Sequence, residues 1–133
     1  SKNILLKVKY LKGKTNIKTT AEDSLGLGYG VCQDHVHIFL ASTRLLGYPS
    51  RYVSGYLMLN NMNIQEASHA WAEVYIENLG WVGFDISNSI SPDDKYVKLA
   101  IGFDYIDVIP ISGIRVGESD EEIKTNILIE SKQ

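Results

Sequence analysis

Three residues that together can perform nucleophilic catalysis follow one another along the chain: Cys32, His69 and Asp85. Cys32 is the only cysteine among 133 residues and lies in the stretch GYGVCQDH, residues 28–35. If a helix begins there, its free N–H groups favour a thiolate, and they can also hold the oxyanion of a tetrahedral intermediate. The alternative interpretation is a small, inert core residue, which is common for free cysteines.

A nucleophilic cysteine needs a base that accepts its proton, and the chain has three histidines. His35 and His37 lie on the same predicted helix as Cys32, and neither faces its N-terminal end well. His69 begins a predicted strand that would pack against this helix. It is therefore the candidate base, with a purely structural histidine as the alternative.

The third group of such a triad orients the base, and Asp85 is the candidate for this role. It ends the return strand of a predicted hairpin. In the simplest hairpin, with a two-residue turn at residues 78–79, Asp85 lies opposite Ala72 and not opposite His69. Pairing with His69 requires a wider turn or a bulge. Alternatively, Asp85 hydrogen-bonds only the turn that follows it.

The elements that position these residues are predicted as helices first and strands afterwards. Thr20 is a good N-cap for a short helix that ends at about residue 27, and a second helix begins near Val31 and stops before Gly47 and Pro49. One stripe of the second helix is apolar and contains the cysteine: Cys32, Val36, Phe39, Leu40, Thr43 and Leu46. More polar residues occupy the opposite side: Gln33, Asp34, His37 and Arg44.

Strands are predicted at residues 51–58, 68–76, 81–86, 96–101, 111–116 and 123–129, with a polar loop at 60–66. Residues 1–19 are expected to form a leading strand or a loose arm. Helices followed by an antiparallel run of five or six strands indicate an α+β fold. Arg51 and Glu73 are expected to form a structural ion pair.

Composition excludes several classes of function. A net charge of −3 provides no basic surface for nucleic acid, and no apolar run is long enough to cross a membrane. One cysteine excludes an internal disulfide framework and, with the absence of a signal-peptide pattern, leads us to expect a cytoplasmic protein. Nothing indicates a cofactor. We expect residues 1–133 to form one domain and, because the chain opens without methionine, to be a piece of a longer protein.

Two groups of residues raise the question of a metal site. His35 and His37 are two residues apart, which places them on different sides of a helix, so we expect no metal site there. The acidic run at residues 118–122 lacks the spaced oxygen ligands of a calcium loop and is expected to be a solvated turn.

Several spaced motifs resemble the transglutaminase-like superfamily in its bacterial branch. They are GVCQD (30–34), HAWAEV (69–74) and GWVGFD (80–85), together with TTAE (19–22), GYPSRYVSGY (47–56) and AIGFDYIDVIP (100–110). The resemblance covers about residues 10–117. Two positions depart from the pattern: Ile86-Ser87 stands where Pro-Thr is common, and Phe103 where arginine is common.

The resemblance implies a papain-like core, with Cys32 as nucleophile, His69 as base and Asp85 as orienting acid. It also implies a further N-terminal region in related chains, which this domain would contact. Four residues are candidates for the substrate cleft: Gly30, Gln33, Trp71 and Tyr105. The alternative for Trp71 is a residue of the hydrophobic core with no role in the site, and the alternative for Tyr105 is a tyrosine packed under a loop.

The function that we expect is thiol-dependent acyl transfer on an amide of a peptide or protein. Water as the acceptor makes the enzyme a protease or amidase, which we favour, and an amine makes it a crosslinking transglutaminase. A peptide-binding module on an inactive version of the same fold is the alternative from another class. The complete set of Cys32, His69 and Asp85 argues against it.

Overall fold

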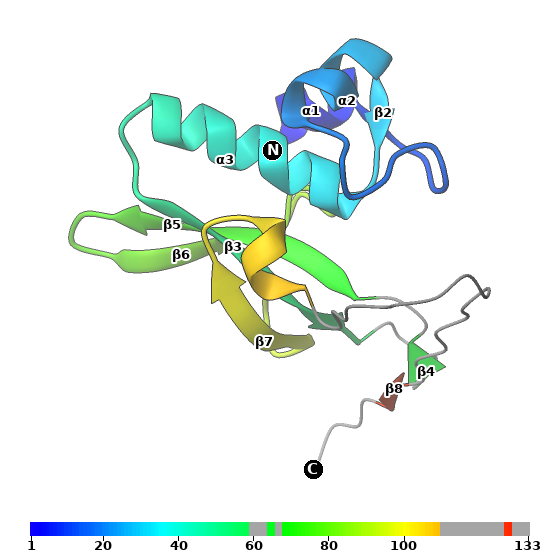
Figure 1. Cartoon of the computed structure of the whole chain (residues 1–133). Coiled ribbons are helices and arrows are strands. Elements are labelled where there is room, and N and C mark those ends of the chain that lie inside the picture. Colours follow the sequence, from blue (N-terminus) through cyan, green and yellow to red (C-terminus); the bar gives the residue numbers. More distant parts are fainter. Residues whose placement is uncertain (59–63, 66–67, 110–126, 129–133) are drawn as a thin grey trace, which may run out of the picture.

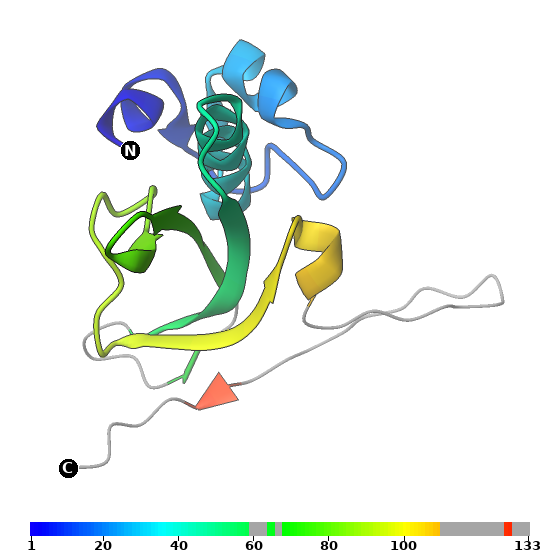
Figure 2. The same ribbon diagram turned by 90° about the vertical axis from the view of Figure 1, so that its left-hand side faces the viewer.

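The computed structural model describes residues 1–58, 64–65, 68–109 and 127–128. Three helices, α1 (Lys2–Lys7), α2 (Ala21–Leu27) and α3 (Cys32–Leu45), pack on one side of an antiparallel sheet (Figures 1 and 2). The sheet has the order β6-β5-β3-β7. Its strands are β3 (Ser50–Leu57), β5 (His69–Ile76), β6 (Gly80–Phe84) and β7 (Tyr96–Gly102).

Shorter elements complete the described part of the chain. β1 (Lys9–Tyr10) pairs in parallel with β2 (Tyr29–Gly30), directly before α3. β4 (Ile64–Gln65) pairs with β8 (Ile127–Leu128), and a 3-10 helix, η1 (Tyr105–Val108), follows β7. The predicted α+β class is confirmed.

The core lies between α3 and the sheet. Val36 and Leu40 of α3 are almost fully buried and contact the inner sheet face and its neighbours, which contribute Tyr52, Ala70, Ala72, Ile86 and Val108. Burying each large apolar side chain contributes roughly 1.5–3 kcal/mol. This packing holds α3 across the sheet, with Cys32 at the edge of the same cluster. Figure 2 shows α3 end-on above the curved sheet.

Local signals set the ends of α2 and α3, the two helices that the sequence predicted. Thr20 accepts a hydrogen bond from the backbone of Asp23 (3.1 Å), whose carboxylate accepts one from Thr20 N–H (3.0 Å), so α2 begins with a capping box. Gly28 ends α2 in the left-handed conformation with φ 73°. The predicted boundaries of both helices are therefore close to those observed.

Other predictions need correction. Residues 1–19 are neither a simple strand nor a loose arm, because α1 forms first and only β1 is extended. Four of the six predicted strands lie in the described part of the chain, and these four form the main sheet. The predicted strand at 111–116 and most of that at 123–129 lie outside the described residues, as does the acidic run at 118–122.

The two sides of α3 also differ from the predicted pattern. Asp34, predicted on the polar side, is 1% exposed, whereas Leu46, predicted in the apolar stripe, is 75% exposed. His35, which the pattern assigns to neither side, is fully buried. Asp34 is buried because its carboxylate accepts hydrogen bonds from the Val31 backbone and the Thr15 hydroxyl, both at 2.7 Å. Leu46 is exposed because it follows the last residue of the helix.

Nothing in the described residues groups three His, Cys, Asp or Glu side chains for a metal ion. None of the helices in these same residues has the length and apolarity to cross a membrane.

Candidate active site

Cys32 is the first residue of α3, and it is partly exposed. Residues 29–30 lead into it as β2, and Val31 is the N-cap in extended conformation. At this position the backbone N–H of Cys32 has no partner within the helix. The thiol therefore sits where the helix end favours an anion and where an N–H is free for an oxyanion.

His69 and Asp85 form a direct pair. Nε2 of His69 lies 2.6 Å from Oδ2 of Asp85, and their side chains are 15% and 0% exposed. The Cys32 side chain lies near enough to His69 for its hydrogen bonding and charge to raise the pKa of the imidazole. Because Nε2 is occupied by Asp85, the remaining ring nitrogen, Nδ1, is the one available to the thiol. The structure thus brings together the three residues that the sequence singled out.

The hairpin register explains how Asp85 reaches His69. Ile76 pairs with Gly80, so the loop has three residues, with Asn78 at φ 65° and Gly80 at φ 79°. This shifts the register by one residue from the simplest hairpin, and Ala72 lies opposite Phe84. Extended by one pair, the register places Asp85 opposite Trp71, on the same face as His69. The simplest hairpin is therefore not the one formed, and the observed turn is the wider one that the pairing of Asp85 with His69 requires.

Asp85 is held by more than the histidine. Its Oδ2 also accepts hydrogen bonds from the Tyr96 hydroxyl (2.6 Å) and the Asn88 side chain (2.7 Å), and its Oδ1 accepts one from the Asn88 backbone (3.1 Å). The last two bonds close the turn after Asp85. The structural role considered from the sequence thus accompanies the contact with His69. Sequence reasoning missed Tyr96 and Asn88, and Asn88 three residues after a strand-end aspartate was the available signal.

These contacts shift both pKa values. Burial lowers the pKa of His69, but hydrogen bonds with Asp85 and Cys32, and their negative charges, outweigh it and raise the pKa to about 9. Burial raises the pKa of Asp85, but hydrogen bonds and the charge of His69 reverse the direction and hold it below its usual value. The arrangement therefore favours an imidazolium next to a carboxylate at neutral pH.

Two aromatic residues shield the His69–Asp85 pair from solvent. Trp71 is 1% exposed and stacks near His69, with ring centroids 6.3 Å apart and an interplanar angle of 30°. Tyr96 meets Trp71 edge-on at 5.3 Å and lies 6.0 Å from His69. Gly55 leaves room for the indole, because a Cβ there would lie 2.7 Å from Trp71 Cη2 and 2.0 Å from the Val97 carbonyl. Trp71 is thus both core and a shield for His69.

The other residues predicted to line the substrate cleft have different surroundings. Gly30 is buried, and a Cβ there would lie 2.7 Å from both Asp34 Cβ and Ser24 Oγ. Packing under the first turn of α3, and not the approach of a substrate, thus explains this glycine. Gln33 is partly buried, and its Nε2 has no hydrogen-bond partner within the described part of the chain.

Tyr105 lines a cavity of about 300 Å³, but away from the triad. This cavity lies along the middle of α3, where His37 and Arg44 face Phe103 and Tyr105 near η1, and none of the triad residues lines it. The Tyr105 ring packs on Tyr52 with centroids 6.1 Å apart. The structure therefore does not bring Tyr105 to Cys32.

The remaining histidines have structural partners. Both ring nitrogens of His35 are engaged: Nε2 lies 3.0 Å from the Val8 carbonyl and Nδ1 lies 2.9 Å from Ser87 Oγ. His35 thus ties the N-terminal segment and the turn after Asp85 to α3. His37 lies 2.9 Å from the Asp104 carboxylate.

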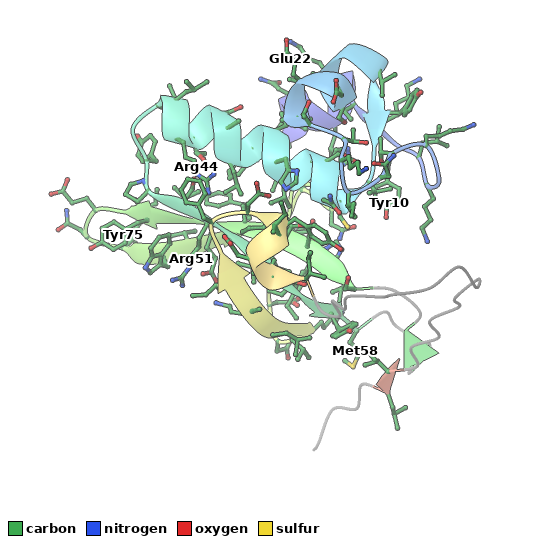
Figure 3. The ribbon with its side chains drawn as sticks, in the orientation of Figure 1. Tyr10, Glu22, Arg44, Arg51, Met58 and Tyr75 are labelled. Atoms are coloured by element: carbon green, nitrogen blue, oxygen red, sulfur yellow. The ribbon has the colours of Figure 1, made fainter. Side chains whose placement is uncertain are left out.

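The predicted ion pair between Arg51 and Glu73 is confirmed, at 2.7 Å. Lys98 also binds Glu73, and the Arg51 guanidinium lies over the Trp81 ring, 4.0 Å from its centroid. Arg51 lies on the side of the sheet that faces away from α3 (Figure 3).

Comparisons with known proteins agree with this geometry. The family model described as Transglutaminase-like superfamily matches residues 2–86, which include all three site residues. The crystal structure of "a Putative Cysteine Protease from Cytophaga hutchinsonii" superposes with a TM-score of 0.75 and 32% identity, covering 97% of this chain and 43% of that one.

Uncharacterized mycobacterial proteins are also similar. One from Mycobacterium leprae is 34% identical over 122 residues, covering 88% of this chain and 43% of the relative. One from Mycobacterium tuberculosis is 34% identical over 124 residues, covering 86% of this chain and 40% of the relative. The chain thus spans less than half the length of these relatives. By the match over most of its length, the chain belongs to the transglutaminase-like superfamily.

Proposed function

We propose that this domain is a thiol-dependent acyl-transfer enzyme acting on peptide or glutamine-type amides, with water as the usual acceptor. Cys32 is the nucleophile, His69 the base and acid, and Asp85 the orienting carboxylate. The observation that carries the proposal is the chain of contacts from Asp85 through His69, at 2.6 Å, to the thiol at the start of α3.

The first half of the reaction forms a thioester. The Cys32 thiolate donates its electron pair to the amide carbonyl carbon, and the carbonyl π pair moves onto oxygen. The free backbone N–H of Cys32 stabilises that oxyanion. When the intermediate collapses, the C–N bond breaks and protonated His69 gives its proton to the leaving amine. Its raised pKa keeps this proton available at neutral pH.

The second half releases the acyl group. Neutral His69 accepts a proton from water, the resulting hydroxide attacks the thioester, and the C–S bond breaks to regenerate the thiolate. A primary amine in place of water would give a crosslink. The similarity to a protein named as a cysteine protease favours water. The connected triad argues against a module that only binds peptides.

The test uses the natural full-length protein and two probes. p-Nitrophenyl acetate should acetylate Cys32, detected by intact mass, and a glutamine-containing peptide should be hydrolysed or, with a fluorescent primary amine present, coupled to it. Cys32→Ala should fold and do neither. If the wild type is not acylated, the proposal is wrong. If coupling exceeds hydrolysis at equal substrate, the enzyme is a crosslinker.

A further inference from the structure

We propose that the hydroxyl of Tyr10 donates a hydrogen bond to the acyl oxygen of the substrate during attack by Cys32. This inference rests on the proposed acyl transfer and adds a residue that none of the motifs contains. It would make Tyr10 a catalytic residue that works together with the backbone N–H of Cys32.

The backbone places Tyr10 beside the nucleophile. β1 and β2 run parallel with Tyr10 opposite Gly30, two residues before Cys32. Hydrogen bonds from Lys9 N–H to the Gly28 carbonyl (2.9 Å) and from Leu11 N–H to the Gly30 carbonyl (2.8 Å) fix this register. Figure 3 shows Tyr10 at the N-terminal end of α3.

The Tyr10 ring is supported from one side and open on the other. It packs against the His35 ring, with centroids 6.0 Å apart, and His35 is itself anchored at both nitrogens. One of those anchors is Ser87, two residues after Asp85. Tyr10 nevertheless remains 48% exposed, so a substrate can reach it.

The charges around Tyr10 suit a donor. Its pKa is raised, mainly by burial and further by the negative charges of Cys32 and Asp85, so the phenol stays protonated at neutral pH. In the part of the chain that the structure describes, nothing hydrogen-bonds this hydroxyl, and it is free to donate to a ligand.

A donor in this position is useful only when negative charge develops on oxygen. One such donor is worth on the order of 10²-fold in rate when it meets an oxyanion. The competing role is a hydrogen bond to the thiolate itself, which would reduce its nucleophilicity. The two roles are separable, because alkylation by iodoacetamide displaces iodide at a saturated carbon and forms no oxyanion.

The experiment compares Tyr10→Phe with Tyr48→Phe in the full-length protein. Tyr48 is a matched control because it is also 48% exposed and lies beyond the far end of α3. For Tyr10→Phe we expect acetylation by p-nitrophenyl acetate to fall on the order of 10²-fold, with iodoacetamide alkylation unchanged within about twofold. Tyr48→Phe should change neither rate.

Three outcomes would overturn the inference. Acetylation of Tyr10→Phe at the wild-type rate would show that Tyr10 makes no catalytic hydrogen bond to the acyl oxygen. An equal fall in both rates assigns Tyr10 a structural role, and a rise in alkylation assigns it to the thiolate. All three require a wild type that is acetylated. A wild type that is not acetylated contradicts the proposed function instead.

Discussion

Two buried carboxylates on the sheet, Asp85 and Glu73, differ in the partners that neutralise them. Glu73 is bound by two basic side chains, Arg51 and Lys98. Asp85 is bound by His69, which can lose its proton and whose second ring nitrogen is left available to the Cys32 thiol. The first cluster can only stabilise strand pairing, whereas the second can move a proton. Burial of a carboxylate therefore does not by itself identify the site.

The largest expected difference between the two clusters is in activity. Asp85→Asn should lower kcat about 10³- to 10⁴-fold, because the amide no longer stabilises imidazolium or fixes its tautomer. Glu73→Gln is the matched control and should leave kcat within about twofold. Both rates are measured with the same amide substrate. Equal losses in the two variants would mean that the clusters do not differ in function.

The second difference is in the pH at which each cluster loses its contribution to stability. The folded-state pKa of His69, about 9, is above its unfolded value, so its contribution is complete below about pH 6.5 and is lost as the pH rises through 9. It is on the order of 3 kcal/mol. The pKa of Glu73 is lowered, despite burial, by Lys98 and Arg51, so its contribution is lost as the pH falls.

Thermal unfolding between pH 4 and pH 10 checks the direction in which pH changes the stability contributed by each cluster. The melting temperature of the wild type should fall on the alkaline side, and His69→Gln should flatten that limb. Glu73→Gln should keep the alkaline limb and reduce the loss on the acid side. An alkaline limb that persists unchanged in His69→Gln would contradict the assignment.

A smaller effect is expected when one support of Asp85 is removed. Tyr96→Phe deletes the hydroxyl at 2.6 Å and keeps the ring against Trp71 and His69. Asp85 keeps the His69 and Asn88 contacts, so we expect a loss of about 1–3 kcal/mol in unfolding free energy and about tenfold in kcat. Urea unfolding and a pH–rate profile measure the two. An unchanged pH–rate profile would mean that Tyr96 contributes only through the packing of its ring.

The smallest effect is expected in the exposed part of the Glu73 cluster. Lys98→Met should cost at most about 1 kcal/mol, because the lysine side chain is 46% exposed and solvent screens the pair. The loss should shrink as salt is added. A loss that is large and independent of salt would show that this cluster is more than a surface ion pair.

Local chemistry predicted the helices well. The Thr20 cap, the glycine after α2 and the stop at Gly47 all act within a few residues, so the sequence showed α2 and α3 and the position of Cys32 at a helix start. α1 was missed because six residues carry too little periodicity. Its Ile4 packs against the core cluster, a contact that no local pattern reveals.

The contact between His69 and Asp85 was harder to predict than the identity of the site residues. Residue order and motifs identified His69 and Asp85, but the three-residue loop with Asn78 at φ 65° decides whether they share a face. The burial of His35 depends on Val8 and Ser87, which are distant in sequence. Such long-range contacts, like that of Tyr96 with Asp85, lie beyond sequence patterns.

The most direct test of the central claim is the rate of Cys32 alkylation by iodoacetamide as a function of pH, in the wild type and in His69→Ala. The account predicts a wild-type rate that stays high well below the ordinary thiol value of about 8.5, and a rate that falls at those pH values in the variant. An ordinary thiol profile, identical in both proteins, would contradict a thiolate–imidazolium pair and with it the proposed chemistry.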